Sequence, residues 1–466
     1  MEQISVRELL TATGGTLIKG RPDEIIYGVS TDSRKIKAGD MFIPLIGEKF
    51  DGHDFILQAV NNGAKAILTQ EAKLQLPYDI QVIQVNNTLT ALQNLAGYYR
   101  RKFNIPVIAV TGSTGKTTAK DMIHHVLQAR FNTLKTEGNL NNEIGLPLTL
   151  LRIERQHEIA VVEMGMSGFG EIRRLADIAR PDYAVITNIG ISHIEKLGSR
   201  ENILKAKMEV FHNFPANGTA ILNGDDDMLR EVRDGLPLNI YYYGTHDGLD
   251  YQAIDIGMTT DGNLQFRVLC RDGEYPFELS VLGRHNVYNS IAAITVGRLF
   301  GMSFQEIREA LHSFETAGMR LNILSTDNGI TVIDDAYNAS PDSMKAALLV
   351  LNDMNAKRRI AVLGDMLELG SYSETAHREV GRAVVGNRID MLITKGKASS
   401  WIGQEARAKG MEASSIFHCS CNKDVINLLG TIVQSGDTIL VKGSRGMKME
   451  EIVSSLVKGG HSSWKY

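Results

Sequence analysis

The chain has 466 residues, which suggests about three domains at roughly 150 residues each. Hydrophobic residues make up 43% and charged residues 22%, a composition that excludes a disordered or fibrous chain. Fifty basic and fifty-four acidic residues give a net charge of -4, so no basic excess indicates nucleic acid or an anionic membrane. The longest apolar runs are strand-sized, well short of the ~18 residues of a membrane span.

The cysteines and the first residues of the chain bear on the cellular compartment in which the protein works. Three cysteines, at 270, 419 and 421, cannot build a disulfide framework, which favours a reducing environment. The first ten residues lack the basic start and apolar stretch of a signal peptide. We therefore expect a cytoplasmic protein with no membrane insertion and no nucleic-acid partner.

Short β-rich runs alternate with helical runs along the chain, which is typical of an α/β protein with largely parallel sheets. The first predicted domain, residues 1–104, is mixed α/β, and the proline at 106 marks its end. Its predicted elements are a strand running into a polar loop at 28–34, a helix at 54–64, a strand at 81–85 and a helix at 89–102.

The second predicted domain, residues 105–318, contains a central parallel sheet. Its predicted strands lie at 107–110, 159–163, 183–188 and 219–223, with helices between them. From 249 to 282 the residues alternate, and Asp-Gly pairs at 261–262 and 272–273 indicate hairpins, so we expect an antiparallel flap. Helices at 286–300 and 303–314 and a hinge at Gly318 close this domain.

The third predicted domain, residues 319–466, is a small, doubly wound, Rossmann-like unit. Its predicted strands at 331–334, 359–363, 391–394 and 438–441 alternate with helices. It lacks a G-x-G-x-x-G fingerprint, so a dinucleotide is not indicated.

The strongest local signal is VIAVTGSTGKTT at 107–118, an apolar strand that leads through a glycine turn into a helix. Gly112 and Gly115 allow a tight turn whose N–H groups point at phosphate, and the helix amino terminus adds positive potential. Lys116 would reach the β- and γ-phosphates and the Thr117 hydroxyl would bind Mg²⁺. Val110 stands where the usual motif has glycine, so a chance Gly-Lys-Thr at a turn is the alternative. The strand, turn and helix in sequence favour nucleotide binding.

Two further polar residues follow predicted strands. Glu163 ends the strand at 159–163, and His193 lies in the loop after the strand at 183–188. Carboxyl ends of parallel strands share one sheet edge, so both residues should lie beside the phosphate loop, where they could hold a divalent metal. Taken singly, Glu163 could be a structural cap and His193 an ordinary loop histidine.

With these residues placed, the chain resembles the Mur ligases of peptidoglycan synthesis, over essentially its whole length. Within that family it is most similar to the members that add D-alanyl-D-alanine. The motifs that carry the resemblance are STDSR at 30–34, FDGHDFI at 50–56, TGSTGKTT at 111–118, GNLNNEIGLP at 138–147, EMG at 163–165, TNIGISH at 187–193, GRHNVYN at 283–289, DDAYNASP at 334–341 and VKGSR at 441–445. The family also has the shorter loop that valine at 110 implies.

The resemblance implies an ATP site and a metal site. ATP would be bound by Gly112, Ser113, Thr114, Gly115, Lys116, Thr117, Thr118, Asn289, Arg320 and Asp335. Mg²⁺ would be held by Thr117 and Glu163, with a second metal at His193 and at Lys207, the lysine that related ligases carbamylate. The alternatives are a solvated helix lysine at 207, a helix cap at 289 and a capping turn at 334–335.

The resemblance also implies the substrates. UDP-N-acetylmuramoyl-tripeptide would meet Thr31, Asp32, Ser33 and Arg34 in the first domain, and then Asn139, Asn141, Tyr337 and Asn338. Lys442 and Arg445 would meet an anionic group of D-alanyl-D-alanine. The 31–34 loop could equally be structural, and the two basic residues could form salt bridges.

The implied reaction is ATP-dependent amide formation through an acyl phosphate by a monomer. The γ-phosphate activates the peptide carboxylate, and the dipeptide amine then displaces phosphate. The catalytic set would be Lys116, Lys207, His193 and Arg320, with domain closure at hinges near residues 104 and 318.

Other readings remain open. Another Mur-type ligase or a folylpolyglutamate-type ligase shares much of this pattern, although the Asp-Asn-Pro motif of diaminopimelate-adding members is missing. A P-loop NTPase that switches a partner belongs to a different class.

Overall fold

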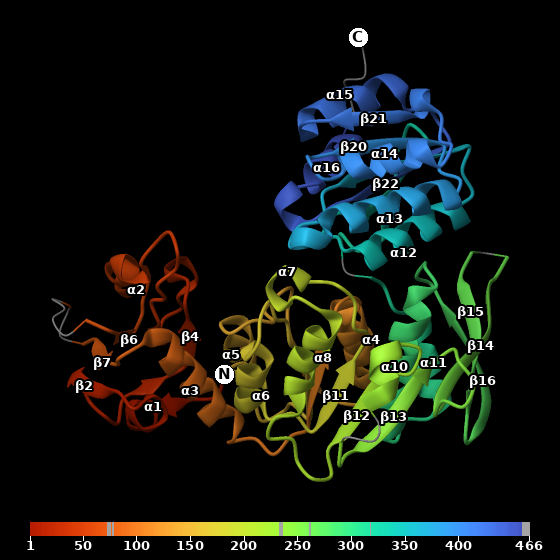
Figure 1. Cartoon of the computed structure of the whole chain (residues 1–466). Coiled ribbons are helices and arrows are strands. Elements are labelled where there is room, and N and C mark those ends of the chain that lie inside the picture. Colours follow the sequence, from red (N-terminus) through yellow and green to blue (C-terminus); the bar gives the residue numbers. More distant parts are fainter. Residues whose placement is uncertain (72–75, 77–78, 233–235, 261, 317, 459–466) are drawn as a thin grey trace.

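The computed structural model describes residues 1–71, 76, 79–232, 236–260, 262–316 and 318–458. Three large sheets follow one another along the chain, so that the α/β fold class is confirmed (Figure 1). A two-stranded antiparallel ribbon pairs β1 (Ile4–Ser5) with β3 (Ile25–Ile26) near the start of the chain. The predicted boundaries after residues 104 and 318 stay predictions.

The first sheet has five strands in the order β2-β7-β6-β5-β4, parallel except for β2. Its strands are β2 (Thr16–Lys19), β4 (Gly28–Ser30), β5 (Asp40–Phe42), β6 (Ala66–Thr69) and β7 (Gln81–Gln84), and its helices are α1 (Val6–Thr13), α2 (Ile56–Asn61) and α3 (Thr88–Arg100). Helix α2 is shorter than predicted because a 3-10 turn at Gly52–Phe55 precedes it, where the Asp51 carboxylate caps the His53 N–H.

The central sheet has nine strands in the order β16-β15-β14-β13-β12-β11-β8-β10-β9. They are β8 (Val107–Thr111), β9 (Thr133–Lys135), β10 (Ile159–Glu163), β11 (Tyr183–Ile186), β12 (Thr219–Asn223), β13 (Asn239–Gly244), β14 (Tyr251–Met258), β15 (Leu264–Cys270) and β16 (Gly273–Leu279). The predicted flap is the antiparallel set β14–β16, and it extends this sheet because β14 pairs in parallel with β13. Asp261 of the first predicted hairpin lies outside the described residues.

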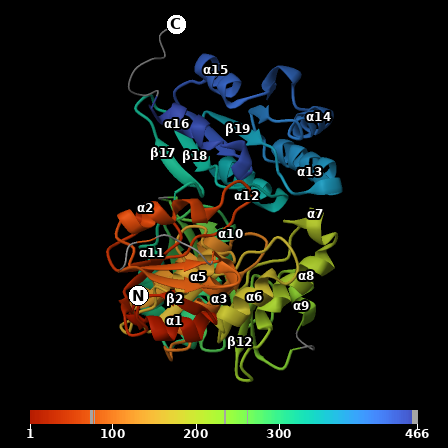
Figure 2. The ribbon, with the colours of Figure 1, turned by 90° about the vertical axis from the view of Figure 1, so that its left-hand side faces the viewer.

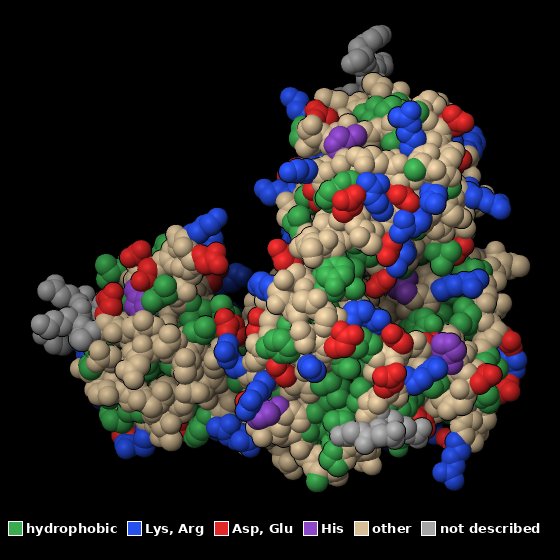
Figure 3. Space-filling model, viewed as in Figure 1, with side chains coloured by type: hydrophobic (Ala, Val, Ile, Leu, Met, Phe, Trp, Pro, Cys, Tyr) green, Lys and Arg blue, Asp and Glu red, His purple; other side chains and the backbone are tan. Residues whose placement is uncertain are grey.

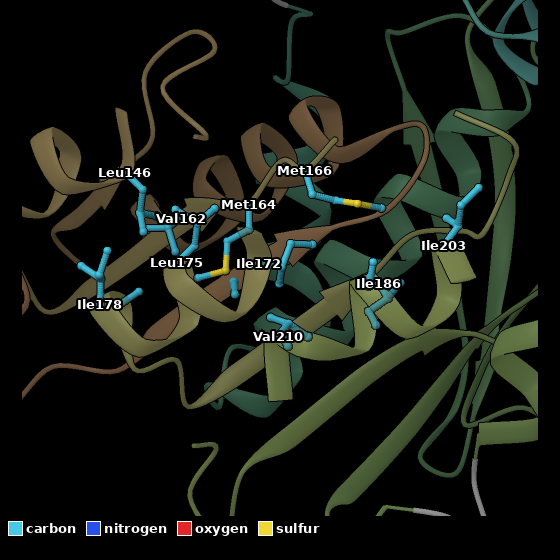
Figure 4. Close-up of a cluster of buried hydrophobic side chains, with 14 of the residues drawn as sticks. Leu146, Val162, Met164, Met166, Ile172, Leu175, Ile178, Ile186, Ile203 and Val210 are labelled. Atoms are coloured by element: carbon cyan, nitrogen blue, oxygen red, sulfur yellow. The ribbon is translucent and has the colours of Figure 1, made fainter. Parts of the chain in front are cut away.

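Helices cover both faces of the central sheet, because alternate strand residues point to opposite sides. On β8, Ile108 and Val110 belong to the core under α4 and α10, whereas Val107 and Ala109 belong to the core under α5 and α6. The second core is drawn in Figure 4 around Leu146 and Met164. The helices are α4 (Lys116–Gln128), α5 (Gly145–Leu150), α6 (Glu171–Ala179), α7 (Ile194–Leu197), α8 (Arg200–Met208), α9 (Asp227–Arg230), α10 (His285–Leu299) and α11 (Phe304–His312).

The junction near residue 104 is packed tightly. Helix α3 lies against α5 and α6, and their side chains share one buried core. The buried Arg100 guanidinium donates to the carbonyls of Ala179 (3.1 Å), Phe103 (2.7 Å) and Ile105 (2.8 Å). Arg100 therefore joins the residues on both sides of the hinge expected near residue 104 to the end of α6.

The third sheet has six strands in the order β17-β18-β22-β19-β20-β21, parallel except for β17. They are β17 (Asn322–Ser325), β18 (Thr331–Asp335), β19 (Arg358–Gly364), β20 (Met391–Lys395), β21 (Ile416–Cys419) and β22 (Asp437–Lys442). The helices are α12 (Pro341–Asp353), α13 (Ser373–Gly386), α14 (Ser400–Ala408), α15 (Asn422–Ile432) and α16 (Glu450–Lys458).

The third unit sits above the central sheet at the end where β8 meets α4, and both views show this placement (Figures 1 and 2). Helix α7 contacts the turn at Gly370–Tyr372, so the two units touch beside the phosphate loop. Acidic and basic side chains are interspersed over the face shown in Figure 3. Within the described ranges, no helix has the length and apolar character to cross a membrane, and all three cysteines are free thiols.

Candidate functional site

The predicted phosphate loop joins β8 to α4, and two of its positions require glycine. At Gly112 φ is +148°, and an added Cβ would lie 1.9 Å from Thr187 Oγ1. At Gly115 φ is +78°, and a Cβ would lie 2.9 Å from Asn289 Oδ1. Any side chain at either position would clash or strain the backbone. The loop is thus pressed between the end of β11 and helix α10.

The loop after β11 holds the phosphate loop in shape. The amides of Ser113 and Thr114 donate to the carbonyl and side-chain oxygens of Asn188, each at 3.0 Å. The Thr187 hydroxyl donates to the Thr114 carbonyl at 2.5 Å. The N–H groups of residues 115–118 have no acceptor among the described residues, as is usual at a helix start. They remain available to an anion, together with the positive end of α4.

Lys116 lies at the start of α4 and turns back over the loop. Its ammonium donates to the carbonyls of Gly112 (2.8 Å) and Ser113 (3.4 Å). Burial lowers the pKa of Lys116, the Glu163 carboxylate acts in the opposite direction, and the Arg320 cation lowers the pKa further. A phosphate group placed on the loop would supply the negative charge that this lysine lacks.

Glu163 ends β10 and is 1% exposed. Its Oε2 accepts from the Thr117 hydroxyl at 2.8 Å and its Oε1 accepts from Asn141 Nδ2 at 2.7 Å. The Asn141 side chain, which the sequence assigned to substrate, therefore holds this carboxylate, while Asn139 lines the cavity. The pair of Thr117 and Glu163 is a hydroxyl and a carboxylate oxygen side by side, both of which are ligands that Mg²⁺ prefers.

Arg320 reaches the phosphate loop from beyond the predicted Gly318 hinge. Its Nη2 donates to the Thr117 hydroxyl at 2.9 Å, and its guanidinium carbon lies 4.2 Å from the centre of the Tyr337 ring. Its neighbours Met319 and Leu321 both have left-handed φ values, +62° and +51°. Such backbone is strained in residues other than glycine, which is consistent with a functional turn at this link.

Asp335 and Lys442 form a buried ion pair where β18 and β22 end side by side. Lys442 Nζ lies 2.5 Å from Asp335 Oδ2 and donates to the Asn338 carbonyl at 3.0 Å. Asp335 Oδ1 accepts from the Leu321 N–H at 3.3 Å. Lys442 was expected to face the dipeptide, and in this structure its charge is already neutralised by Asp335. Arg445 lies at the surface and pairs with Glu450 at 3.2 Å.

Helix α10 contributes Asn289 and His285 to the site. Asn289 Nδ2 donates to Asn286 Oδ1 at 3.0 Å, so this asparagine is oriented within the buried face of the helix. His285 was not predicted. Burial lowers its pKa to about 4, with the Asp335 carboxylate opposing this shift. A neutral imidazole therefore lies between helix α10 and the ion pair described above.

His193 faces the third unit across the interface. It has a left-handed φ of +63° and precedes α7. Its Nδ1 lies 2.5 Å from Glu368 Oε2, without the alignment of a hydrogen bond, so this buried nitrogen has no hydrogen-bond partner among the described residues. Burial lowers the pKa of His193, and Glu368 opposes that shift. Glu368, from the loop after β19, was not predicted.

Lys207 lies on α8 with 2% exposure, and its side-chain amine has no hydrogen bond or ion pair to any residue that the structure describes. Burial lowers its pKa well below the usual range, and the Lys116 cation adds to this shift. It is therefore not the solvated helix lysine that the sequence left as an alternative. The lowered pKa favours the uncharged amine, which is the nucleophilic form of lysine.

A cavity of about 640 Å³ brings most of these residues together between the central and third units. Of the predicted residues, those that line it are Ser113, Thr114, Gly115, Lys116, Thr117, Thr118, Asn139, Asn141, Glu163, His193, Asn289, Arg320, Asp335, Tyr337, Asn338 and Lys442. Gly112 underlies the loop, and Lys207 is buried beside it.

The predicted residues of the first unit are not in this cavity. Thr31 starts the loop after β4, and Asp32 forms an ion pair with Arg34 at 2.9 Å, which lowers the Asp32 pKa to about 2. The Ser33 hydroxyl is buried and donates to Gln58 Oε1 at 2.8 Å. Ser33 therefore supports the loop, while Arg34 is exposed beside it.

The fold and the site define a class. A strand, a glycine-containing loop and a helix present lysine, threonine and a buried glutamate to a cavity, and a second α/β unit supplies an arginine across that cavity. This arrangement is typical of P-loop enzymes that use nucleotides between two domains.

Comparisons with known proteins identify the family. Three family profiles match the chain: "Mur ligase family, catalytic domain" over residues 25–110, "Mur ligase middle domain" over 110–297 and "Mur ligase, glutamate ligase domain" over 319–445. The chain belongs to the Mur ligase family.

Similar proteins match over nearly their whole length. The UDP-N-acetylmuramoyl-tripeptide–D-alanyl-D-alanine ligase of Bacillus subtilis is 43% identical over 97% of this chain and 98% of its own. A crystal structure of MurF from Acinetobacter baumannii has a TM-score of 0.89 at 32% identity and covers 98% of this chain and 99% of that one. MurF from Thermotoga maritima, solved in complex with ADP, has a TM-score of 0.81 at 30% identity and covers 93% and 97%.

Proposed function

We propose that this protein is an ATP-dependent ligase that joins D-alanyl-D-alanine to UDP-N-acetylmuramoyl-tripeptide in peptidoglycan precursor synthesis. The observation that carries the proposal is the 43% identity to a relative of that name over 97% of the chain. The cavity supports it, because phosphate-binding and carboxylate groups from the central unit face Arg320, Tyr337 and Asn338 from the third.

Magnesium fits the residues present. Mg²⁺ is usually held by one or two carboxylates together with phosphate oxygens and waters. Thr117 and Glu163 offer a hydroxyl and a carboxylate 2.8 Å apart on the wall of the phosphate cavity. The described residues contain no cluster of three His, Cys, Asp or Glu that could hold a metal alone. The bound ion would neutralise charge on the transferring phosphate.

The proposed reaction must first activate the peptide carboxylate, which is a poor electrophile. A peptide carboxylate reacts poorly with amines because oxide is a poor leaving group. In the proposed reaction a carboxylate oxygen attacks the γ-phosphorus of ATP, ADP leaves, and an acyl phosphate forms. The dipeptide amine then attacks the carbonyl carbon, phosphate leaves with the former carboxylate oxygen, and the nitrogen loses a proton.

The chain's own part is electrostatic. Lys116, the free N–H groups at residues 115–118 and Arg320 concentrate positive charge where the phosphoryl group passes. Arg320 joins this set only when the third unit lies against the central one, as it does here. Contact between the units also excludes water that would hydrolyse the acyl phosphate.

Lys207 has the properties that carbamylation needs. Burial lowers the pKa of this lysine and so favours the uncharged amine, which can attack CO₂ and release a proton to give a carbamate. The product would be a negatively charged oxygen donor near His193, whose Nδ1 lies 2.5 Å from Glu368 Oε2. We assign this pair to a second metal, with Lys207 in its carbamylated form.

The first unit supplies the remaining substrate contacts in this proposal. The exposed Arg34 and the half-buried Asp32 and Thr31 would meet the uridine diphosphate end of the precursor. Asn289 would contact the adenine, and Tyr337 and Asn338 the peptide. The monomeric state and the cytoplasmic location remain predictions from the sequence.

The assay is phosphate release from ATP and magnesium in the presence of UDP-N-acetylmuramoyl-tripeptide, with and without D-alanyl-D-alanine. Mass spectrometry follows the nucleotide-linked product. Dipeptide-dependent release with the pentapeptide product supports the proposal. Phosphate release only with a single amino acid would support the ATP site but refute D-alanyl-D-alanine as the acceptor. ATP turnover that no acceptor stimulates would favour a P-loop NTPase that switches a partner.

A further inference from the structure

Lys120 is a buried cation that the proposed reaction does not use. It lies on α4 one turn after Lys116, in a helix whose other buried residues are mostly apolar, and it is 1% exposed. Burying an ammonium group is costly unless it is paired and hydrogen-bonded. Lysine at this position therefore indicates a task that an apolar residue cannot perform.

One partner of Lys120 lies just past the end of β9, and the other lies next to it on α4. Its Nζ donates to the Thr136 carbonyl at 2.7 Å and lies 3.2 Å from Asp121 Oδ1. Asp121 also accepts from Lys135 at 2.8 Å. Thr136 is fully buried just past the end of β9, where its carbonyl has left the strand ladder and needs a donor.

Thr136 in turn fixes Glu163. Its hydroxyl accepts the Glu163 N–H at 3.0 Å, and its own N–H donates to the Val161 carbonyl at 3.0 Å. These bonds continue the parallel pairing of β9 with β10 beyond the last ladder residue. The backbone of Glu163 is thus set by a threonine whose opposite side is held by Lys120.

The three bonds close a ring through α4. Thr117, three residues before Lys120 on the same helix, donates to Glu163 Oε2 at 2.8 Å. Glu163 N–H bonds Thr136, and Thr136 C=O bonds Lys120, which returns to the helix. Hydrogen bonds therefore fix both the backbone and the carboxylate of Glu163 relative to α4, the helix that follows the phosphate loop.

We propose that Lys120 is a positioning residue that, through Thr136, holds the Glu163 carboxylate in register with Thr117 for the magnesium–nucleotide complex. The inference rests on the proposed function, in which Glu163 faces magnesium. Lys120 touches no substrate, and its effect passes through Thr136.

The test measures binding of AMP-PNP by calorimetry at a series of magnesium concentrations. Lys120→Met removes the ammonium and keeps an unbranched side chain. We expect it to raise the magnesium needed for half-maximal binding by about ten-fold or more, as loss of a partner behind a metal ligand usually does. AMP-PNP binding without magnesium should not change. Lys135→Met is the control, because Lys135 shares Asp121 but does not bond Thr136.

A second pair of variants tests the same path without removing the buried charge. Thr136→Val deletes the hydroxyl and leaves the carbonyl for Lys120, so it should raise the magnesium requirement in the same direction, and Thr136→Ser should restore it. A solely structural role would lower the melting temperature and leave the magnesium requirement of the folded protein unchanged.

Two results would overturn the inference: an unchanged magnesium requirement in folded Lys120→Met, or an unchanged requirement in Thr136→Val. Failure of the proposed function is a different result. In that case wild-type binding would not depend on magnesium, or Glu163→Gln would leave the magnesium requirement where it was.

Discussion

The ion pair between Lys442 and Asp335 makes a quantitative prediction about the third unit. Both side chains are nearly buried, at 3% and 13% exposure. Lys442→Met leaves the Leu321 N–H, at 3.3 Å, as the remaining hydrogen-bond donor to the Asp335 carboxylate among the described residues. Losing one partner of a buried pair costs about 3–5 kcal/mol, and the partial exposure of Asp335 favours about 3 kcal/mol.

This loss should be visible by calorimetry. For a domain of this size roughly 2–4 °C of melting temperature is lost per kcal/mol, so the third unit should melt roughly 6–12 °C lower. Lys345→Met is the control, because Lys345 pairs with Asp342 at the surface with side chains 42% and 52% exposed. Such exposed pairs contribute about 0–1 kcal/mol. Adding Asp335→Asn to Lys442→Met should recover part of the loss, since a neutral amide needs no cation.

The reasoning fails if Lys442→Met has the same melting temperature as the wild type and the Lys345→Met control. That result would mean that water or another cation solvates Asp335, and that the pair does not hold β18 to β22. A loss in Lys442→Met that Asp335→Asn deepens would also contradict it, because the penalty would then not come from an unpaired carboxylate.

Three further predictions follow from single contacts. Asn141→Ala removes the donor to Glu163 Oε1, so the magnesium concentration for half-maximal activity should rise about ten-fold; an unchanged value would return Asn141 to a substrate role. Arg100→Met leaves three carbonyls without their donor and should cost about 3 kcal/mol in urea unfolding, whereas no loss would mean that the junction is not clamped. Burial lowers the His124 pKa from 6.5 to about 4, so the unfolded chain takes up a proton that the folded protein refuses, and stability should fall from about pH 6.5 toward pH 4. His124→Gln should reduce this loss of unfolding free energy between pH 6.5 and pH 4, and an unchanged pH dependence would refute the assignment to His124.

The phosphate loop could be predicted because its signals are local. Strand, glycines, lysine and helix follow one another within twelve residues, and each has its own conformational cause. The alternation of strands and helices similarly predicted the parallel sheets. Among the strands that escaped prediction, β17 and β21 are four-residue strands at the edges of their sheet, where a half-exposed run carries little pattern.

The contacts that decide each role are not local. Thr117 and Arg320 meet across 203 residues, and Asp335 and Lys442 across 107, so no spacing rule links them. In the sequence, nothing distinguishes Lys120 from a solvent-facing helix lysine. Its burial is seen only in the fold, where the end of β9 packs against it. Glu368 reaches His193 only because two units touch, and Asn141 turns toward Glu163 only because the chain folds back over β10. In each case the residue type was visible and its partner was not.

The most direct test of the central claim, activation of a carboxylate by phosphoryl transfer, follows an oxygen atom. UDP-N-acetylmuramoyl-tripeptide labelled with ¹⁸O in the reacting carboxylate is incubated with ATP, magnesium, D-alanyl-D-alanine and the enzyme, and the released phosphate is examined by mass spectrometry. The proposed mechanism transfers one labelled oxygen to each phosphate released. Unlabelled phosphate formed together with the pentapeptide product would contradict an acyl phosphate and the account built on it.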